Sequence, residues 1–182
     1  NKLEVEKLQV TVGRTRLNLD GAAGPVPDPL ARDGYRFELV SNDSVIAPED
    51  TTEQPVQVQL KLAGIFSAAS RTFDLSDIRM RSSSGEASGA GTYTIAPGIS
   101  DGMSLDLNVK DMAVAQVKPI WPWFAGPNAR RWVMQKFFGG KVIDGRVKFA
   151  VAPGRLDDPS PLSEQEISGR FEVSGSRFDT AG

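Results

Sequence analysis

Apolar and polar residues alternate one by one along most of this chain. The clearest stretch is residues 56–62, where valine and leucine occupy every second position and glutamine and lysine lie between them. A period of two residues places the apolar side chains on one face of a β-strand and the polar ones on the other. The pattern recurs in seven further segments: 8–12, 17–19, 35–39, 87–95, 103–109, 147–151 and 167–173. These segments are predicted to be strands of an antiparallel sheet with one apolar and one wet face.

The alternation slips by one residue in a single place within an otherwise regular segment. Phe73 and Leu75 share one phase, whereas Ile78 and Met80 follow the other. A β-bulge inserts one extra residue into a strand and shifts its phase in this way. We therefore expect a bulge or bend at residues 76–77.

The segments between the predicted strands have the composition of turns. They are rich in Gly, Pro, Asp and Ser, and they comprise residues 21–29, 48–53, 82–85, 97–102 and 153–161. Residues 153–166 are predicted to be the longest and loosest loop. Because the composition does not change along the chain, residues 1–182 are predicted to form a single β-rich domain.

One segment departs from the period of two. Pro127 is suited to the first position of a helix, and Gly139–Gly140 can adopt the left-handed conformation that ends one. Between them, apolar residues recur at helical spacing: Ala129, Trp132, Val133 and Phe137. The sequence therefore predicts one short amphipathic helix at residues 127–138.

One short helix cannot cover the apolar face of about eight to ten strands. The sheet must therefore close on itself as a sandwich or barrel, or leave an apolar groove open. An apolar surface that stays open is typical of a binding site for an apolar partner. The predicted fold class is accordingly mainly β, with a curved or twisted antiparallel sheet that is either an open groove or partly closed.

The residue inventory excludes several kinds of active site. The chain contains no His and no Cys, which excludes imidazole and thiolate metal sites, Ser-His-Asp triads and Cys-His pairs. The carboxylate pairs Glu49/Asp50 and Asp157/Asp158 lie in predicted turns and are interpreted as solvated, as is Asp74/Asp77. A net charge of −2 gives no argument for nucleic-acid binding. We expect neither an enzyme nor a cofactor or metal.

Aromatic and basic residues are concentrated in residues 117–142. This stretch holds all three tryptophans and five cations: Lys118, Arg130, Arg131, Lys136 and Lys141. It contains no acidic residue. The candidate binding residues here are Trp121, Trp123, Phe124, Arg130, Arg131 and Trp132. One interpretation is that the rings plug one end of the sheet, and another is that rings and cations meet a membrane interface. Base stacking beside a positive groove fits less well, because the basic patch is small.

The same stretch carries a resemblance to a known family. "VKPIWPWFAGPNARRWVMQKFFGGKVIDGRVKFAV" resembles the signature of the AsmA-like proteins, in particular the YhdP-type branch. The matching positions are Lys118, Trp121, Pro122, Ala125, Pro127, Ala129, Arg130, Trp132, Val133, Gly140, Asp144 and Val147. Upstream, "FDLSDIRMRSSSGEASGAGTYTI" is similar to the recurring strand–turn–strand unit of that family. Together the two stretches extend over Phe73–Val151, somewhat less than half of the chain.

The resemblance implies a section of a large envelope protein of Gram-negative bacteria. Such a protein is anchored in the inner membrane by an N-terminal helix, and its periplasmic part carries phospholipid along a hydrophobic β-groove for the homeostasis of the outer membrane. The chain begins at Asn1, and we expect the anchor only in the full-length protein. The family has no catalytic residues to carry over.

The predicted partner is therefore the acyl chains of phospholipid, and envelope proteins are further partners of unknown identity. The candidate groove residues are the apolar sets of four strands: Val56, Val58, Leu60, Leu62, Phe73, Leu75, Leu105, Leu107, Val147 and Phe149. The alternative is that these side chains pack against each other in a closed β-sandwich, which would serve as a structural or interaction module in envelope assembly without binding lipid.

Overall fold

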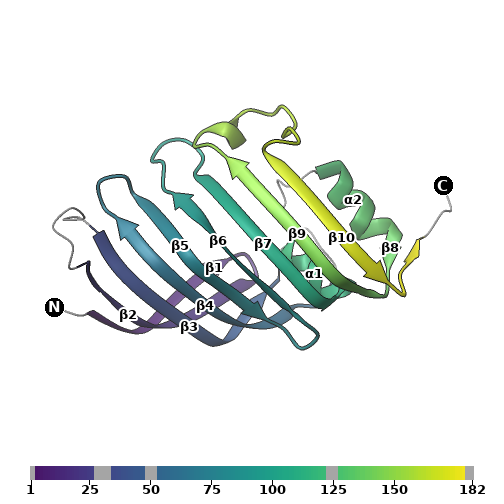
Figure 1. Cartoon of the computed structure of the whole chain (residues 1–182), viewed down its shortest axis with the longest axis horizontal. Helices are drawn as coiled ribbons and strands as arrows, with labels where there is room; N and C mark the ends of the chain where they lie inside the picture. The colour runs from purple at the N-terminus through teal and green to yellow at the C-terminus, as the bar shows by residue number, and fades with distance from the viewer. Residues whose placement is uncertain (1–2, 27–33, 48–52, 122–126, 179–182) are drawn as a thin grey trace.

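The computed structural model describes residues 3–26, 34–47, 53–121 and 127–178, and one antiparallel sheet dominates them (Figure 1). Its nine strands lie in the order β1-β2-β3-β4-β5-β6-β7-β9-β10. They comprise β1 Leu3–Val12, β2 Thr15–Pro25, β3 Gly34–Ile46, β4 Val56–Ser67, β5 Thr72–Arg81, β6 Glu86–Thr94, β7 Gly102–Ala113, β9 Lys141–Val151 and β10 Ile167–Ser174. The sheet is open, with β1 and β10 at its edges, so the predicted mainly β, antiparallel fold is confirmed.

The sheet is strongly twisted. In Figure 1 the purple strands β1 and β2 run at a wide angle to the yellow-green strands β9 and β10. Neighbouring strands of a sheet rotate by roughly 20–25° relative to each other, and this rotation accumulates over nine strands. The twist separates the two edges, which agrees with the open arrangement.

Bulges keep the apolar residues on one face. The predicted bulge at residues 76–77 is confirmed, because the register of β5 shifts between Leu75 and Ile78 against β6. Leu75 thereby faces Gly64 of β4, and Ile78 faces Leu62, so both stay on the face that Phe73 and Met80 share. Similar register shifts occur in β1 between Val5 and Leu8, in β3 between Ser41 and Ser44, and between β9 and β10.

Two helices interrupt the sheet, where the sequence predicted one. Helix α2 (Pro127–Lys136) begins at the predicted proline, but it ends two residues early. Phe137 and Phe138 instead form β8 (Phe137–Phe138), which pairs with β11 (Arg177–Phe178) near the end of the chain. Gly139 and Gly140 have the expected positive φ, of 63° and 75°, and form the turn from β8 to β9.

The unpredicted helix is α1 (Val114–Ile120), which continues directly from β7. Its seven residues include three valines or isoleucines and Pro119, which are weak helix formers, and the helix has no side-chain N-cap. Seven residues are too few to establish a helical period. Among the described residues, no helix has the length and apolar character needed to cross a membrane.

One predicted turn is largely strand. Residues 21–25 belong to β2, where Gly21 pairs with Leu39 and Ala23 with Phe37 of β3, whereas the rest of the predicted turn lies almost wholly outside the described residues. The glycines and Pro25 of this segment indicated a turn, but pairing with β1 and β3 on both sides outweighs that local preference. The predicted turns at 82–85 and 97–102 join β5 to β6 and β6 to β7. The predicted turn at 48–53 falls mostly outside the described residues.

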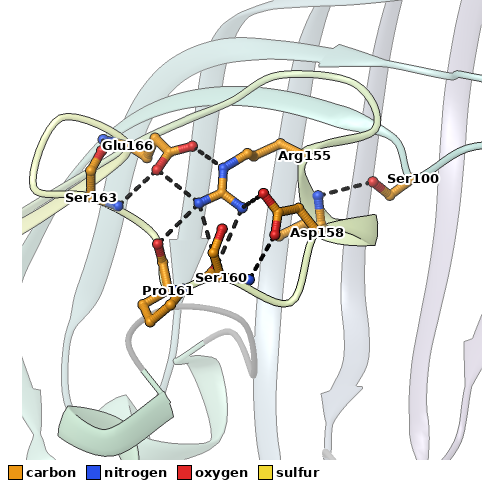
Figure 2. Close-up of polar contacts among 8 residues, drawn as sticks. Ser100, Arg155, Asp158, Ser160, Pro161, Ser163 and Glu166 are labelled. Carbon is orange, nitrogen blue, oxygen red and sulfur yellow. Dashed lines mark hydrogen bonds and ion pairs between the residues drawn. The ribbon is translucent and has the colours of Figure 1, made fainter.

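The loop between β9 and β10 is not loose, contrary to the prediction. It contains the short 3-10 helix η1 (Arg155–Asp157), and the Arg155 guanidinium is the centre of its contacts (Figure 2). This group binds Glu166 through two nitrogens and donates to the carbonyl oxygen of Pro161 at 3.0 Å. The loop is also tied to the β6–β7 connection, because the backbone N–H of Leu156 donates to Ser100 Oγ at 3.1 Å. The sequence could not predict that this loop is well ordered, because Arg155 meets Glu166 and the carbonyl oxygen of Pro161 only once the loop has folded.

Glycines on the apolar face allow close approach between neighbouring strands. A Cβ atom on Gly64 of β4 would lie 1.9 Å from the carbonyl oxygen of Asp74 on β5. A Cβ atom on Gly89 of β6 would lie 2.0 Å from the carbonyl oxygen of Asp106 on β7. Both neighbours are backbone atoms within the ladder, so neither can yield without a shift of a whole strand.

We predict that G64A destabilises the protein by about 2 kcal/mol, because the added methyl group overpacks the β4–β5 ladder. G169A is the matched control in β10, since its Cβ would meet nothing closer than the ring of Phe171 at 3.3 Å. The control should change the free energy of unfolding by less than about 0.5 kcal/mol. Urea denaturation measures both, and equal midpoints for the two variants would contradict the close approach.

Candidate functional site

The apolar side chains form continuous rows across the strands. Because residues that pair in an antiparallel ladder point to the same face, each row can be followed from strand to strand. One row across β3–β10 consists of Leu39, Leu62, Ile78, Gly89, Leu107, Val147 and Gly169. The next row consists of Phe37, Gly64, Leu75, Gly91, Leu105, Phe149 and Ile167. We call this side of the sheet the apolar face; its residues come from seven neighbouring strands.

The opposite side of the sheet is polar and charged. One of its rows consists of Lys61, Arg79, Ser88, Asn108, Arg146 and Arg170. Cross-strand ion pairs follow this side: Arg146 binds both carboxylate oxygens of Asp106, at 2.8 and 2.6 Å. This bidentate hydrogen bonding lowers the pKa of Asp106 to about 2. The charges keep this side of the sheet in water, so an apolar ligand has one face to bind.

All ten predicted groove residues lie on the apolar face. Seven of them are half-buried: Leu60, Leu62, Phe73, Leu75, Leu105, Leu107 and Val147. The other three, Val56, Val58 and Phe149, are only 3–4% exposed. Within the described residues the apolar face is covered by no second layer of the sheet, so the sandwich arrangement is not the one observed.

The two helices cover one end of the apolar face. A cluster of buried side chains joins β4, β5, β6, β7 and β9 to the helical segment: Val56, Val58, Met80, Ala87, Val109, Met112, Val114, Phe137 and Val142. Val117, Ile120 and Val133 of the helices pack against this cluster. Val56 and Val58 are therefore core residues under the helices rather than open groove residues. The prediction missed this because α1 was not expected.

Lys118 of α1 holds this helical end together. Its side chain is 2% exposed, and its Nζ lies 2.8 Å from Glu53 Oε1. The same ammonium donates to the carbonyl oxygen of Met134 in α2 at 3.2 Å and lies 4.8 Å from the centre of the Phe138 ring. One cation thus joins α1, α2, β8 and the segment before β4. The sequence analysis counted Lys118 only as one of five cations in the aromatic and basic stretch, and no local signal in the sequence pairs it with Glu53.

The other aromatic and basic candidates have different environments. Arg130 is buried and donates from Nε to the carbonyl oxygen of Trp121 at 3.2 Å. Trp121 stacks on Phe171 of β10, with ring centres 6.0 Å apart. Trp132 is half exposed and stacks on Phe137. Arg131 is exposed. Trp123 and Phe124 lie outside the described residues.

A polar contact marks the other end of the apolar face. Tyr93 belongs to the outermost row, between Phe73 and Met103, and its hydroxyl donates to Asp101 in the β6–β7 connection. Asp101 also accepts a hydrogen bond from the backbone N–H of Ala96 at 2.9 Å. The hydrogen bond to Asp101, together with burial and the carboxylate charge, raises the pKa of Tyr93 to about 12. This contact was not predicted from the sequence.

The candidate carboxylate pairs that the structure describes have structural partners. Asp157 accepts a hydrogen bond from the backbone N–H of Ser100, and Asp158 one from that of Ser160, so this pair organises the β9–β10 loop. Asp77 pairs with Arg79 on the polar side. No group of three or more acidic side chains suited to a metal occurs among the described residues. Glu49 and Asp50 are outside the described residues.

We predict that E53Q destabilises the protein by about 3 kcal/mol, because it leaves the buried ammonium of Lys118 without a counter-charge. The matched control is E38Q, which breaks the 2.9 Å pair with the more exposed Lys61 and should cost less than about 1 kcal/mol. In the double variant E53Q/K118M, part of the loss should be recovered. Urea denaturation compares the variants, and a loss in E53Q no larger than in E38Q would contradict the role of the pair.

We predict that the Tyr93 phenol ionises near pH 12 and that D101N moves its ionisation to lower pH. The chain has two tyrosines, so Y35F leaves Tyr93 as the single phenol whose ionisation is followed by tyrosinate absorbance. Because the folded protein keeps this proton after the unfolded chain has lost it, the contribution to stability should decline as pH rises above about 10. Identical titration curves for Y35F and Y35F/D101N would refute the contact.

Comparison with known proteins identifies no relative. No protein-family model, no curated protein and no solved structure matches this chain. The resemblance to the AsmA-like proteins therefore depends on the sequence alone, on the aromatic and basic stretch and the upstream strand–turn–strand unit. The function has to be argued from the geometry of the apolar face.

Proposed function

We propose that this chain is a non-enzymatic segment of a periplasmic, AsmA-like envelope protein, and that its apolar face binds the acyl chains of phospholipid. The observation that carries the proposal is the continuity of the apolar rows across seven strands, on a sheet without a second covering layer among the described residues. The resemblance of residues 117–151 to the AsmA-like signature supports the envelope location and the membrane anchor in the full-length protein.

The apolar face has an energetic reason to bind hydrocarbon. Leu62, Leu75 and Leu107 are half-buried, so part of each side chain remains in contact with water. Removing apolar surface from water stabilises a complex by about 25 cal/mol per Å². An antiparallel sheet normally packs its apolar face on a core, and here the two helices cover one end of it.

The chemistry of the rows favours an acyl chain over a peptide. A peptide would bring backbone N–H and C=O groups that need hydrogen-bond partners when buried. The central rows consist of aliphatic residues, Phe and Gly, whose side chains offer none. A hydrocarbon chain requires no such partners, so the rows suit lipid better.

The dimensions also fit. A row that crosses the seven strands β3–β10 spans six inter-strand spacings of ~4.8 Å, or about 29 Å. The hydrocarbon of one membrane leaflet is about 15 Å thick, half of the ~30 Å core of a bilayer. An extended acyl chain can therefore lie along a row and leave room for movement across the strands. The open edges β1 and β10 agree with a section of a longer groove.

A second candidate is an interaction module without lipid. The edge strand β1 favours it, because Leu3 and Val12 are 66% and 71% exposed and Leu8 and Val10 are also exposed. An exposed apolar edge strand is suited to pairing with a strand of another protein. The experiment below separates the two candidates.

We predict that the protein takes up a phosphatidylethanolamine with a fluorescent acyl chain from vesicles, and that L107E reduces this uptake at least ten-fold, because a carboxylate on the apolar face must be desolvated. N108E is the matched control: it places the same charge on the next residue of β7, on the polar side. Uptake by N108E should equal that of the unmodified protein.

Lipid extraction and native mass spectrometry of protein purified from a Gram-negative host provide a second readout. Protein that carries no phospholipid and takes up none of the probe would refute the proposal and favour the interaction module. Equal losses in L107E and N108E would refute the assignment to the apolar face. If circular dichroism indicates that L107E is unfolded, L107N replaces it, since asparagine is close to leucine in size.

A further inference from the structure

We infer that the pocket between α1, α2, β9 and β10 binds the end of one hydrocarbon chain of an anionic, single-chain amphiphile such as a fatty acid. This inference builds on the proposed function, because the pocket lies at the helical end of the same apolar face. The experiment below is chosen so that the two can fail separately.

The pocket has an apolar lining. Its walls are Val114, Val117, Lys118, Trp121, Trp132, Val133, Phe137, Val142, Phe171 and Val173. The Lys118 ammonium is already bonded to Glu53 and to the carbonyl oxygen of Met134, so the pocket wall is its side-chain stem. Such a lining suits a ligand that needs no hydrogen bonds.

The aromatic pairs and the Lys118 contacts define the shape of the pocket. Trp121 stacks on Phe171, and Trp132 stacks on Phe137 with ring centres 6.5 Å apart, so each indole is fixed against a second ring. Lys118 joins α1 to α2 through Met134 and so fixes the separation of the helices. Stacked rings and a bonded ammonium resist collapse into the empty space, which keeps the pocket available to a ligand.

The volume limits the ligand to one chain. The pocket measures about 250 Å³. An apolar cavity of ~150 Å³ already stays dry and admits benzene, whereas pockets for drug-sized ligands measure ~300–1,000 Å³. The end of one hydrocarbon chain fits, and a phospholipid with two chains does not.

The charge of α2 favours an anionic headgroup. The helix carries Arg130, Arg131 and Lys136 and has no acidic residue. Lys136 follows Trp132 by four residues, so the two side chains lie on the same side of the helix, and Trp132 is half exposed. A carboxylate at the chain end nearest Trp132 would therefore lie beside cations.

The test uses a fatty acid that carries bromine near its methyl end, because bromine quenches indole fluorescence on contact. Trp121 and Trp132 line the pocket, so saturable quenching is expected in the unmodified protein. V133F fills the pocket and should weaken binding at least ten-fold. The matched control, V12F, makes the same substitution on the exposed edge strand β1 and should leave binding unchanged.

The apolar-face variant L107E separates the pocket from the proposed function. It should retain fatty-acid quenching while losing the fluorescent phospholipid, and V133F should behave in the opposite way. Loss of fatty-acid quenching in L107E but not in V133F would overturn the inference and leave the proposed function intact. Quenching without any phospholipid uptake would overturn the proposed function alone.

Two further measurements complete the test. The brominated alcohol of the same chain length should bind more weakly than the acid, and K136Q should reduce this difference. Equal binding of acid and alcohol would overturn the anionic assignment. If V133F does not fold, V133L replaces it and should weaken binding by a smaller factor. Unchanged quenching in a folded pocket-filling variant would overturn the inference.

Discussion

The phase of the side chains along each strand is the constraint on which the rest of this structure depends. A shift of one residue moves every following side chain to the other face of a sheet. In β5 the extra residue at positions 76–77 returns Ile78 and Met80 to the face that Phe73 and Leu75 occupy. Similar shifts in β1 and β3 do the same for their strands. Without these bulges the apolar rows would be interrupted, and neither the helical core nor a continuous apolar face could form.

The two faces of the sheet differ in chemical character: one carries rows of apolar residues and the other carries rows of polar and charged residues. The ion pairs of the polar side, such as Arg146–Asp106, remain in water, whereas the apolar side is the surface that we propose for binding. The two ends of the apolar face carry different elements. Tyr93, Asp101 and the ordered loop around Arg155 lie at one end, and the helices lie at the other. The half-buried middle of the face is the part that we propose for acyl chains.

The buried Lys118 both stabilises the helical end of the sheet and lines the pocket beside it. Burying an ammonium costs desolvation free energy, which Glu53 offsets in part. The same ammonium donates to the carbonyl oxygen of Met134 in α2, and the stem of Lys118 lines the pocket that we assign to a single hydrocarbon chain.

The sequence by itself determined where most of the nine-stranded sheet lies along the chain, the phase slip in β5, the start of α2 at Pro127 and the face on which all ten groove candidates lie. Each of these follows from local periodicity or from the backbone preferences of single residues, which neighbouring positions in the chain reveal. Only the tertiary structure decided that the sheet is open, that Val56 and Val58 lie under α1, that Phe137 pairs with Phe178, and that Lys118 is buried against Glu53. These features depend on contacts between residues far apart in the chain, for which local patterns carry no signal.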